Sequence, residues 1–202
     1  MPLDTTRIVA DDEFARIADG EERRAIDTLT LAFADDPVIR WMYPEAQRFL
    51  HGFPRFLAAF GGASFDEQTA YRLGDFAAAA LWMPPGVAPD ADDIVAAVFE
   101  TVDQEKHADF LAVAARMDAA HPTFRHWYLP WFGVDSALQN RGVGARLMRR
   151  CLDFVDAAHL PAYLESPNPK NLPFYRRFGF EVIGEAQVGA CPPVFFMLRD
   201  AR

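Results

Sequence analysis

The sequence predicts an α/β fold with one mixed central sheet, on the basis of three observations. From residue 127 onward, segments typical of strands and helices alternate in the order strand, helix, strand, helix, strand, strand. This alternation is typical of a sheet that combines parallel and antiparallel pairing. A glycine-containing loop joins the first of these strands to the first helix. In addition, 51% of the 202 residues are apolar, which is enough for a substantial buried core.

One globular domain over residues 1–202 is expected, because no repeat, linker or low-complexity stretch divides the chain. The longest apolar run, Phe76 to Met83, stops at Pro84, far short of the roughly 20 residues that a membrane-spanning helix needs. The first residues carry neither the basic nor the apolar stretch of an export signal. We therefore expect a cytoplasmic protein without membrane partners.

The charge balance and the cysteines indicate which partners suit the chain. Twenty Lys and Arg residues against twenty-nine Asp and Glu residues give a net charge of −9. Such a protein repels nucleic acid and favours cationic small molecules. Cys151 and Cys191 lie outside any metal-binding spacing and are expected to be buried apolar residues. The sequence therefore predicts no nucleic-acid partner and no metal site.

Before residue 127 the pattern predicts helices and one hairpin. Three segments show the apolar spacing of three and four that is typical of helices: residues 21–34, 45–60 and 92–120. The first is expected to end at Asp35-Asp36-Pro37, the second to kink or restart at Pro54, and the third to break near residues 104–107. Two segments on either side of Gly74-Asp75 are expected to pair as a hairpin: residues 69–73 and 76–83.

The elements from residue 127 onward follow one another closely. Segments with β-branched, aromatic or alternating apolar residues predict four strands: residues 127–134, 162–165, 181–185 and 194–198. Pro130 and Gly133 interrupt the first of these strands. Two apolar stripes predict helices: residues 143–158 and 171–178. Gly179 is expected to end the second helix.

The loop before the helix at residue 143 has the outline of an anion site. It reads Gln139-Asn140-Arg141-Gly142-Val143-Gly144-Ala145. A helix N-terminus carries about +0.5 charge and unpaired amides, and a residue without Cβ lets a phosphate approach them. A tight turn with close helix packing is the alternative use of the glycines. A Walker A motif is absent, and Leu147 stands at the third glycine position of the dinucleotide fingerprint.

This loop resembles the pyrophosphate loop of the GNAT superfamily of N-acetyltransferases. That loop has Gln or Arg, two residues, Gly, one residue, then Gly or Ala, and Gln139, Gly142 and Gly144 match it. The strand end Gly133-Val134-Asp135 precedes it, and the segment from Asn168 to Phe180 follows at the expected separation. The resemblance covers residues 127–198. Four stretches look most like the puromycin acetyltransferase branch: Ala32-Phe33-Ala34-Asp35, His126-Trp127-Tyr128-Leu129, Leu164-Glu165-Ser166 and Asn171-Leu172-Pro173-Phe174-Tyr175.

The resemblance implies a GNAT fold, with a mixed sheet of about six or seven strands, a splayed parallel pair and helices on both faces. It implies acetyl-CoA as co-substrate, no metal, and direct attack by the primary amine of a small molecule in a ternary complex. The oligomeric state is left open, with a homodimer as one alternative. The residues that it implies for coenzyme A binding are Phe132, Gly133, Val134, Gln139, Asn140, Arg141, Gly142, Val143, Gly144, Ala145, Asn171 and Tyr175.

Acetyl transfer needs a neutral amine, a stabilised oxyanion and a protonated leaving thiol. Because an amine with a pKa of about 10.4 is protonated at pH 7, a carboxylate or His is useful as a base. Glu165, at the end of the strand beside the glycine-loop strand, is the first candidate, and His126 and His121 are alternatives. A backbone N–H of residues 132–134 would meet the oxyanion. The resemblance gives Tyr175 the role of protonating the thiolate, and simple packing is the alternative.

Three functions remain open from the sequence. The leading one is an N-acetyltransferase acting on a small amine. A second is a non-catalytic acyl-CoA-binding domain with a regulatory role, and the presence of both Tyr175 and Glu165 argues against it. A third is acetylation of a protein amine, and the lack of a basic peptide-binding run argues mildly against that function.

Overall fold

The computed structural model describes residues 13–202, and in this part of the chain seven strands form one sheet in the order β1-β2-β3-β4-β5-β7-β6. The strands are β1 (Phe14–Arg16), β2 (Ala70–Leu73), β3 (Ala78–Met83), β4 (Trp127–Val134), β5 (Ala162–Ser166), β6 (Glu181–Ala186) and β7 (Val194–Arg199). Strands β4 and β5 are parallel, and the other neighbours are antiparallel. The expected mixed sheet is therefore confirmed. The N-terminal residues on which the expectation of no export signal rests lie outside the described residues.

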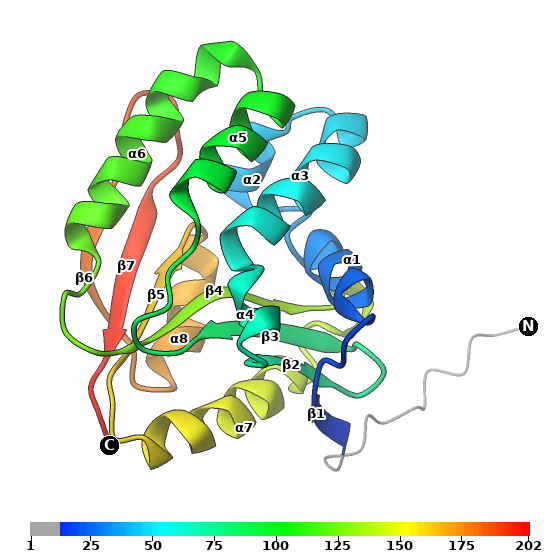
Figure 1. The fold of residues 1–202 in the computed structure, drawn as a ribbon, viewed down its shortest axis with the longest axis vertical. Helices are drawn as coiled ribbons and strands as arrows, with labels where there is room; N and C mark the ends of the chain where they lie inside the picture. Colours follow the sequence, from blue (N-terminus) through cyan, green and yellow to red (C-terminus); the bar gives the residue numbers. More distant parts are fainter. Residues whose placement is uncertain (1–12) are drawn as a thin grey trace, which may run out of the picture.

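Helices cover both faces of this sheet, as expected (Figure 1). They are α1 (Glu22–Ala32), α2 (Pro37–Met42), α3 (Ala46–Gly61), α4 (Ala63–Asp66), α5 (Ala91–Thr101), α6 (His107–Ala120), α7 (Val143–Ala157) and α8 (Leu172–Arg176). Apolar residues of α7 pack with one buried cluster, which includes Leu147 and Cys151. Helices α1 and α3 pack in another, which includes Leu29 and Phe53. Both cysteines are buried and free, as expected.

Strands β4 and β5 part soon after they meet. Among the described residues their ladder joins Trp127 to Ala162 and Tyr128 to Tyr163, and both strands then continue without pairing to each other. On its other side β4 carries one extra residue, because Leu81 and Met83 of β3 face Trp131 and Tyr128. Pro130 lies in this bulge and has no N–H to give to a ladder. The interruption predicted at Pro130 therefore lies where the parallel pair splays, whereas the one predicted at Gly133 is wrong, because Gly133 pairs in register with Ala79 of β3.

Helix α2 corrects the expectation for Asp35-Asp36-Pro37, which ends one helix and also begins the next. The Asp36 carboxylate accepts hydrogen bonds from Val38 N at 3.0 Å and Ile39 N at 3.1 Å. Pro37 occupies the first helical position, where its missing N–H costs no hydrogen bond. A sequence that stops a helix can therefore start one at the same residues.

The structure settles three further expectations for the part of the chain before residue 127. A kink or a restart was expected at Pro54, and the restart is wrong, because α3 runs through Pro54 without a break. Pro54 leaves the carbonyl of Leu50 without its helical donor, and Leu50 is half exposed, so water can reach that side of the helix. The break between α5 and α6 is confirmed at the 3-10 turn Gln104–Lys106. The hairpin is confirmed too, but its turn spans residues 74–77, with Phe76 in the left-handed region at φ 59°.

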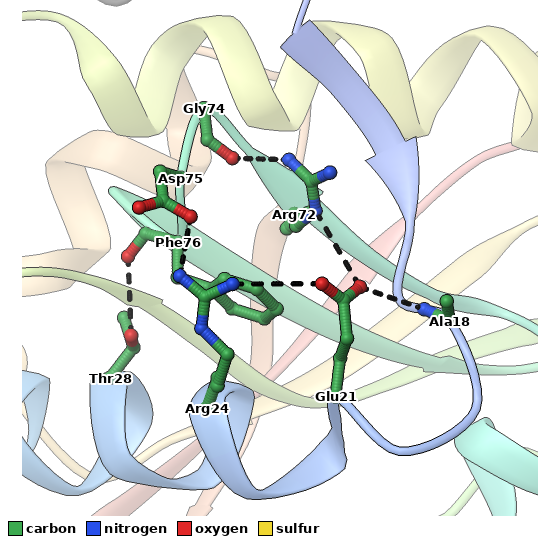
Figure 2. Close-up of polar contacts among 8 residues, drawn as sticks. All are labelled: Ala18, Glu21, Arg24, Thr28, Arg72, Gly74, Asp75 and Phe76. Atoms are coloured by element: carbon green, nitrogen blue, oxygen red, sulfur yellow. Dashed lines mark hydrogen bonds and ion pairs between the residues drawn. The ribbon is translucent and has the colours of Figure 1, made fainter.

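A polar cluster fixes that hairpin to the start of α1 (Figure 2). The guanidinium of Arg24 forms ion pairs with Asp75 and, at 3.6 Å, with Glu21, and it lies 4.3 Å from the centre of the Phe76 ring. Arg72 Nε lies 3.9 Å from the same Glu21 carboxylate. Several of these charges are exposed, so each pair adds little stability alone, but together they define how α1 sits on the sheet edge.

Candidate active site

The loop between β4 and α7 ends in a helix N-terminus that no side chain caps. Asp135 binds the amide of Ala137 at 2.8 Å and so shapes the 3-10 turn Ser136–Leu138. Gly142 precedes the helix in the left-handed conformation at φ 80°. The first-turn amides of α7 therefore lack a capping side chain, as an anion-binding terminus requires.

The two glycines of the loop serve different purposes. A Cβ on Gly142 would meet no other atom within 4 Å, so the loop is open at this point. A Cβ on Gly144 would lie 3.1 Å from Val134 Cγ2, which shows that α7 packs closely against the end of β4. The Gln139 side chain binds back to the Val134 carbonyl at 3.3 Å, while Arg141 is exposed. The open glycine, the uncapped amides and the nearby cation fit a pyrophosphate group.

A cavity of about 500 Å³ lies where β4 and β5 diverge. Its wall is mainly apolar and comes from both strands and from α2, α3, α5 and α6. The aromatic and large apolar residues in this wall include Phe33, Trp41, Met42, Phe56, Phe60, Phe110, Leu111, Met117 and Trp131. Sequence periodicity gives several of these residues a core position, and they form the cavity wall as well. Trp131 also donates its indole N–H to the Leu57 carbonyl at 3.1 Å, which holds the ring in place.

Polar residues from several elements also line this cavity. Glu165 and Tyr175, the two expected catalytic residues, both line it, together with Asn171, Asp118 and His121. The Glu165 side chain is 7% exposed. The structure therefore brings the expected base and the expected proton donor to one cavity.

Glu165 stands beside two histidines that the sequence proposed as alternatives to it. His121 directly follows α6, and its Nδ1 lies 3.7 Å from Glu165 Oε1. The Nε2 atoms of His121 and His126 are 3.0 Å apart. Burial, followed by the charge of Glu165, raises the pKa of Tyr128 and of Tyr163, so both phenols stay neutral beside the carboxylate.

Tyr175 lies on α8 and is 8% exposed. Burial, and to a lesser extent the charge of Asp36, raises its pKa, so the hydroxyl holds its proton firmly. Asp36 is itself buried, and burial raises its pKa to about 6 against the opposing effect of the Val38 and Ile39 amides. No functional role for Asp36 is predicted from the sequence. The Asp-Pro pattern, which is typical of a helix start, could have identified Asp36 as a helix cap. It could not have shown that the charge of Asp36 acts on Tyr175.

The expected coenzyme A residues occupy two adjoining places. Phe132, Asn171 and Tyr175 line the cavity, and residues 139–145 surround the start of α7. Gly133 faces α1, where an added Cβ would come 2.7 Å from the Ala32 Cβ. The glycine at this position is therefore explained by helix packing.

Within residues 13–202, no helix is both long and apolar enough to cross a membrane. In the same range, no three His, Cys, Asp or Glu side chains are grouped so as to hold a metal ion.

The splayed parallel pair, the open glycine loop and the cavity lined by Glu165 and Tyr175 are the features expected of an acyl-transfer enzyme whose acyl donor carries phosphate. Residues 53–180 match the Acetyltransferase (GNAT) family, and the chain belongs to this family of N-acetyltransferases, which use acetyl-CoA.

Three known proteins show how the chain relates to this family. An uncharacterized N-acetyltransferase of Schizosaccharomyces pombe is 28% identical over 181 residues, which are 82% of this chain and 72% of the relative. The structure of histone acetyltransferase HPA2 and related acetyltransferase from Corynebacterium glutamicum is 20% identical with a TM-score of 0.64, covering 94% of this chain and 96% of that one. Arylalkylamine N-acetyltransferase 2 of Aedes aegypti is 11% identical with a TM-score of 0.64, covering 94% and 98%. The structural matches confirm the GNAT fold.

Proposed function

We propose that this enzyme acetylates the primary amine of a small molecule that has an apolar, preferably aromatic, body. The observation that carries the proposal is the cavity at the splay, whose lining combines a largely aromatic wall with two carboxylates, those of Glu165 and Asp118. Its volume of about 500 Å³ suits a small ligand. The wall would bury the apolar body, while Glu165 and Asp118 would attract an ammonium group.

The net charge and one structural relative support this substrate class. The net charge of −9 favours cationic over anionic acceptors. The Aedes aegypti relative has the same fold and is an arylalkylamine N-acetyltransferase. The sequence likeness to the puromycin acetyltransferase branch agrees with an aromatic amine, without implying puromycin itself.

Acetyl-CoA supplies a thioester as the acyl donor. The amides at the start of α7, with Arg141, would hold its pyrophosphate, because they are uncapped and a Cβ on Gly142 would meet only open space. Asn171 and the end of β4 near Phe132 would hold the arm that leads into the cavity.

Glu165 would accept the proton that the acceptor ammonium must lose before it can attack. Its low exposure strengthens its attraction for that cation, and the neutral phenols of Tyr128 and Tyr163 add no competing charge. A backbone N–H of residues 132–134 would stabilise the oxyanion.

Tyr175 would donate its hydroxyl proton toward the departing sulfur. Its raised pKa makes full ionisation costly, so the phenol must regain a proton as the thiol forms. The second proton that the amine nitrogen loses is available for this purpose.

The test is a panel of acceptors incubated with the purified protein and acetyl-CoA, with free thiol and acetylated product both measured. Arylalkylamines should show the highest kcat/KM, followed by alkyl amines and then polyamines and acidic amino acids. Turnover with a peptide N-terminus or lysine only would contradict the proposed substrate class, and acetyl-CoA binding without any turnover would support a regulatory domain instead.

A matched pair of variants tests the base. Glu165→Gln keeps the size of the side chain and should lower kcat/KM by about 10²-fold or more, within the range of general-base effects. Glu181→Gln makes the same change at an exposed position of β6 and should leave kcat/KM unchanged. Equal activity of both variants would remove Glu165 from the mechanism.

A further inference from the structure

We infer that His121 and His126 form a relay that carries the proton of the acceptor amine from Glu165 in the cavity to solvent. The inference rests on the proposed function, and it assigns to the two histidines a joint role that neither would have alone. Glu165 lies at the inner end of the row and His126 at the outer end.

The row of groups is continuous in space although its members come from separate segments. Glu165 belongs to β5, His121 follows the end of α6, and His126 immediately precedes β4. Glu165 Oε1 lies 3.7 Å from His121 Nδ1, and His121 Nε2 lies 3.0 Å from His126 Nε2. The first gap closes with a small movement of either side chain. The second is already a hydrogen-bond distance.

Hydrogen-bonding rules assign the resting proton positions. His126 Nδ1 lies 2.8 Å from the Phe124 carbonyl oxygen, which can only accept, so this nitrogen carries a hydrogen. In neutral His126 the Nε2 atom is then an acceptor, and the hydrogen in its 3.0 Å contact must belong to His121 Nε2. Neutral His121 therefore presents an unprotonated Nδ1 toward Glu165. This is the arrangement that can accept a proton on the cavity side and release one on the outer side.

One transfer cycle can be written with every proton accounted for. The acceptor ammonium gives a proton to the Glu165 carboxylate, which passes it to His121 Nδ1. His121 then releases the hydrogen on its Nε2 to His126 Nε2. His126, now protonated on both nitrogens, releases its Nδ1 hydrogen to a water that takes the place of the Phe124 carbonyl, and exchange with water returns both rings to their resting tautomers before the next turnover. The neutral amine attacks the thioester, its nitrogen loses a second proton on becoming an amide, and that proton ends on the coenzyme A thiol. The products are the amide, the thiol and one proton in solution.

The surroundings favour outward release. Burial lowers the pKa of His126, and the neighbouring His121 lowers it further, although the Phe124 carbonyl and Glu165 act in the opposite direction. His126 is thus a weak base that does not retain the proton at neutral pH. The other ionisable groups facing the pair are Tyr128 of β4, Tyr163 of β5 and Asp118, which lines the same cavity from α6. Burial and the charge of Glu165 raise the pKa of both phenols, so they stay neutral beside the carboxylate.

The exit of the row is accessible. His126 is half-buried, and the adjacent Phe124 has half of its surface exposed. The hydrogen bond from His126 Nδ1 to the Phe124 carbonyl is itself exposed, so water or a buffer molecule can replace the carbonyl there, whereas the Glu165 side chain is 7% exposed.

The experiment compares His126→Gln and His121→Gln with a control, His159→Gln, at saturating acetyl-CoA and amine in dilute buffer. His159 is an exposed histidine after α7 whose Nδ1 also bonds a backbone carbonyl, that of Arg202 at 2.8 Å. The two relay variants should lose about tenfold or more in kcat, as expected for removal of a proton carrier. Added imidazole should restore His126→Gln to within about threefold of the wild type, because a small base can replace an accessible one. The control should match the wild type.

The outcomes separate the relay from the proposed function. A wild type that acetylates no amine overturns the proposed function and the relay with it. An active wild type whose His126→Gln variant keeps its kcat, or loses kcat without any response to imidazole, overturns the relay alone. Nitrogen NMR of the resting wild type gives an independent readout: the relay requires hydrogen on Nδ1 of His126 and on Nε2 of His121, and the opposite tautomers would overturn it.

Discussion

Arg199 binds Asp156 through two hydrogen bonds, from Nη1 at 2.6 Å and from Nη2 at 2.9 Å, and so joins the last strand of the sheet to α7. The Arg199 residue is 2% exposed, and its Nε donates to the Phe178 carbonyl at 2.9 Å. Each of the three nitrogens of the buried guanidinium thus has a hydrogen-bond partner. The pair connects β7, α7 and the segment after α8.

We expect Asp156→Ala to lower the free energy of unfolding by about 2–4 kcal/mol, because the buried guanidinium of Arg199 loses its carboxylate partner. Water compensates for part of this loss, since the Asp156 side chain is partly exposed. Asp27→Ala is the control, since it breaks the exposed Arg23–Asp27 pair and should cost less than about 1 kcal/mol. Urea unfolding of the three proteins measures both values. Equal losses in the two variants would contradict the importance of the buried pair.

Asp36 should make the fold less stable above neutral pH than in mild acid. Its pKa is raised from 3.8 to about 6, so the folded protein binds more protons than the unfolded chain between these values, and this contribution falls as the pH rises. Asp36→Asn keeps the cap without a buried charge and should add about 1–3 kcal/mol of stability at pH 8 and almost none near pH 4.

The control for this prediction is Asp90→Asn, which changes the exposed aspartate that caps α5. Urea unfolding at both pH values should show little pH dependence in the difference between this control and the wild type. A stabilisation by Asp36→Asn that is the same at pH 4 and pH 8 would show that the buried charge is not its cause.

Gly142→Ala should weaken coenzyme A binding about tenfold, because a Cβ would stand in the open space at the start of α7 where a phosphate must approach the amides. Gly20→Ala is a matched control, since Gly20 also has a positive φ, of 88°, and open space around it. The backbone strain of about 1–2 kcal/mol is then common to both variants. Calorimetric titration with coenzyme A gives the affinities, and equal binding by both would refute the assignment of the loop.

Tyr175→Phe should lower kcat about 10- to 100-fold while the KM for acetyl-CoA changes little, since the hydroxyl is proposed to act on the leaving sulfur and the ring keeps its packing. Tyr71→Phe removes another buried phenol, on β2, and should leave kcat unaltered. Steady-state kinetics with single-turnover checks will separate chemistry from product release. A kcat within twofold of the wild type, with chemistry rate-limiting, would reduce Tyr175 to a packing residue.

The region from β4 to β7 could be predicted from the sequence because its signals are local. The left-handed Gly142, at φ 80°, stands where α7 begins, and the left-handed Gly179, at φ 89°, closes the turn that follows α8, which ends earlier than expected, at Arg176. The amino-terminal half was harder. Strand β1 has three residues and forms by pairing with β2, which no local pattern indicates. Helix α2 was missed because Pro37 is as typical of a helix start as of a helix end.

The candidate site likewise has a part that could be predicted from local sequence and a part that could not. The glycine loop is one continuous segment, so its motif sufficed to place it. The contact between Glu165 and His121 joins residues that are far apart in the chain, and it depends on how α6 ends against the sheet. The raised pKa of Asp36 is a result of burial by neighbours from other elements, which sequence spacing does not record.

The short ladder between β4 and β5 also has a mechanical consequence. Among the described residues, two pairs join a four-stranded part of the sheet to a three-stranded part. A molecule that lies between the diverging strands and binds both links the two parts of the sheet, because they can no longer separate without releasing it. Its binding free energy adds to the stability of the folded state, so the melting temperature should rise with ligand concentration. The increase in melting temperature then ranks ligands of the cavity by their affinity, even where no reaction takes place.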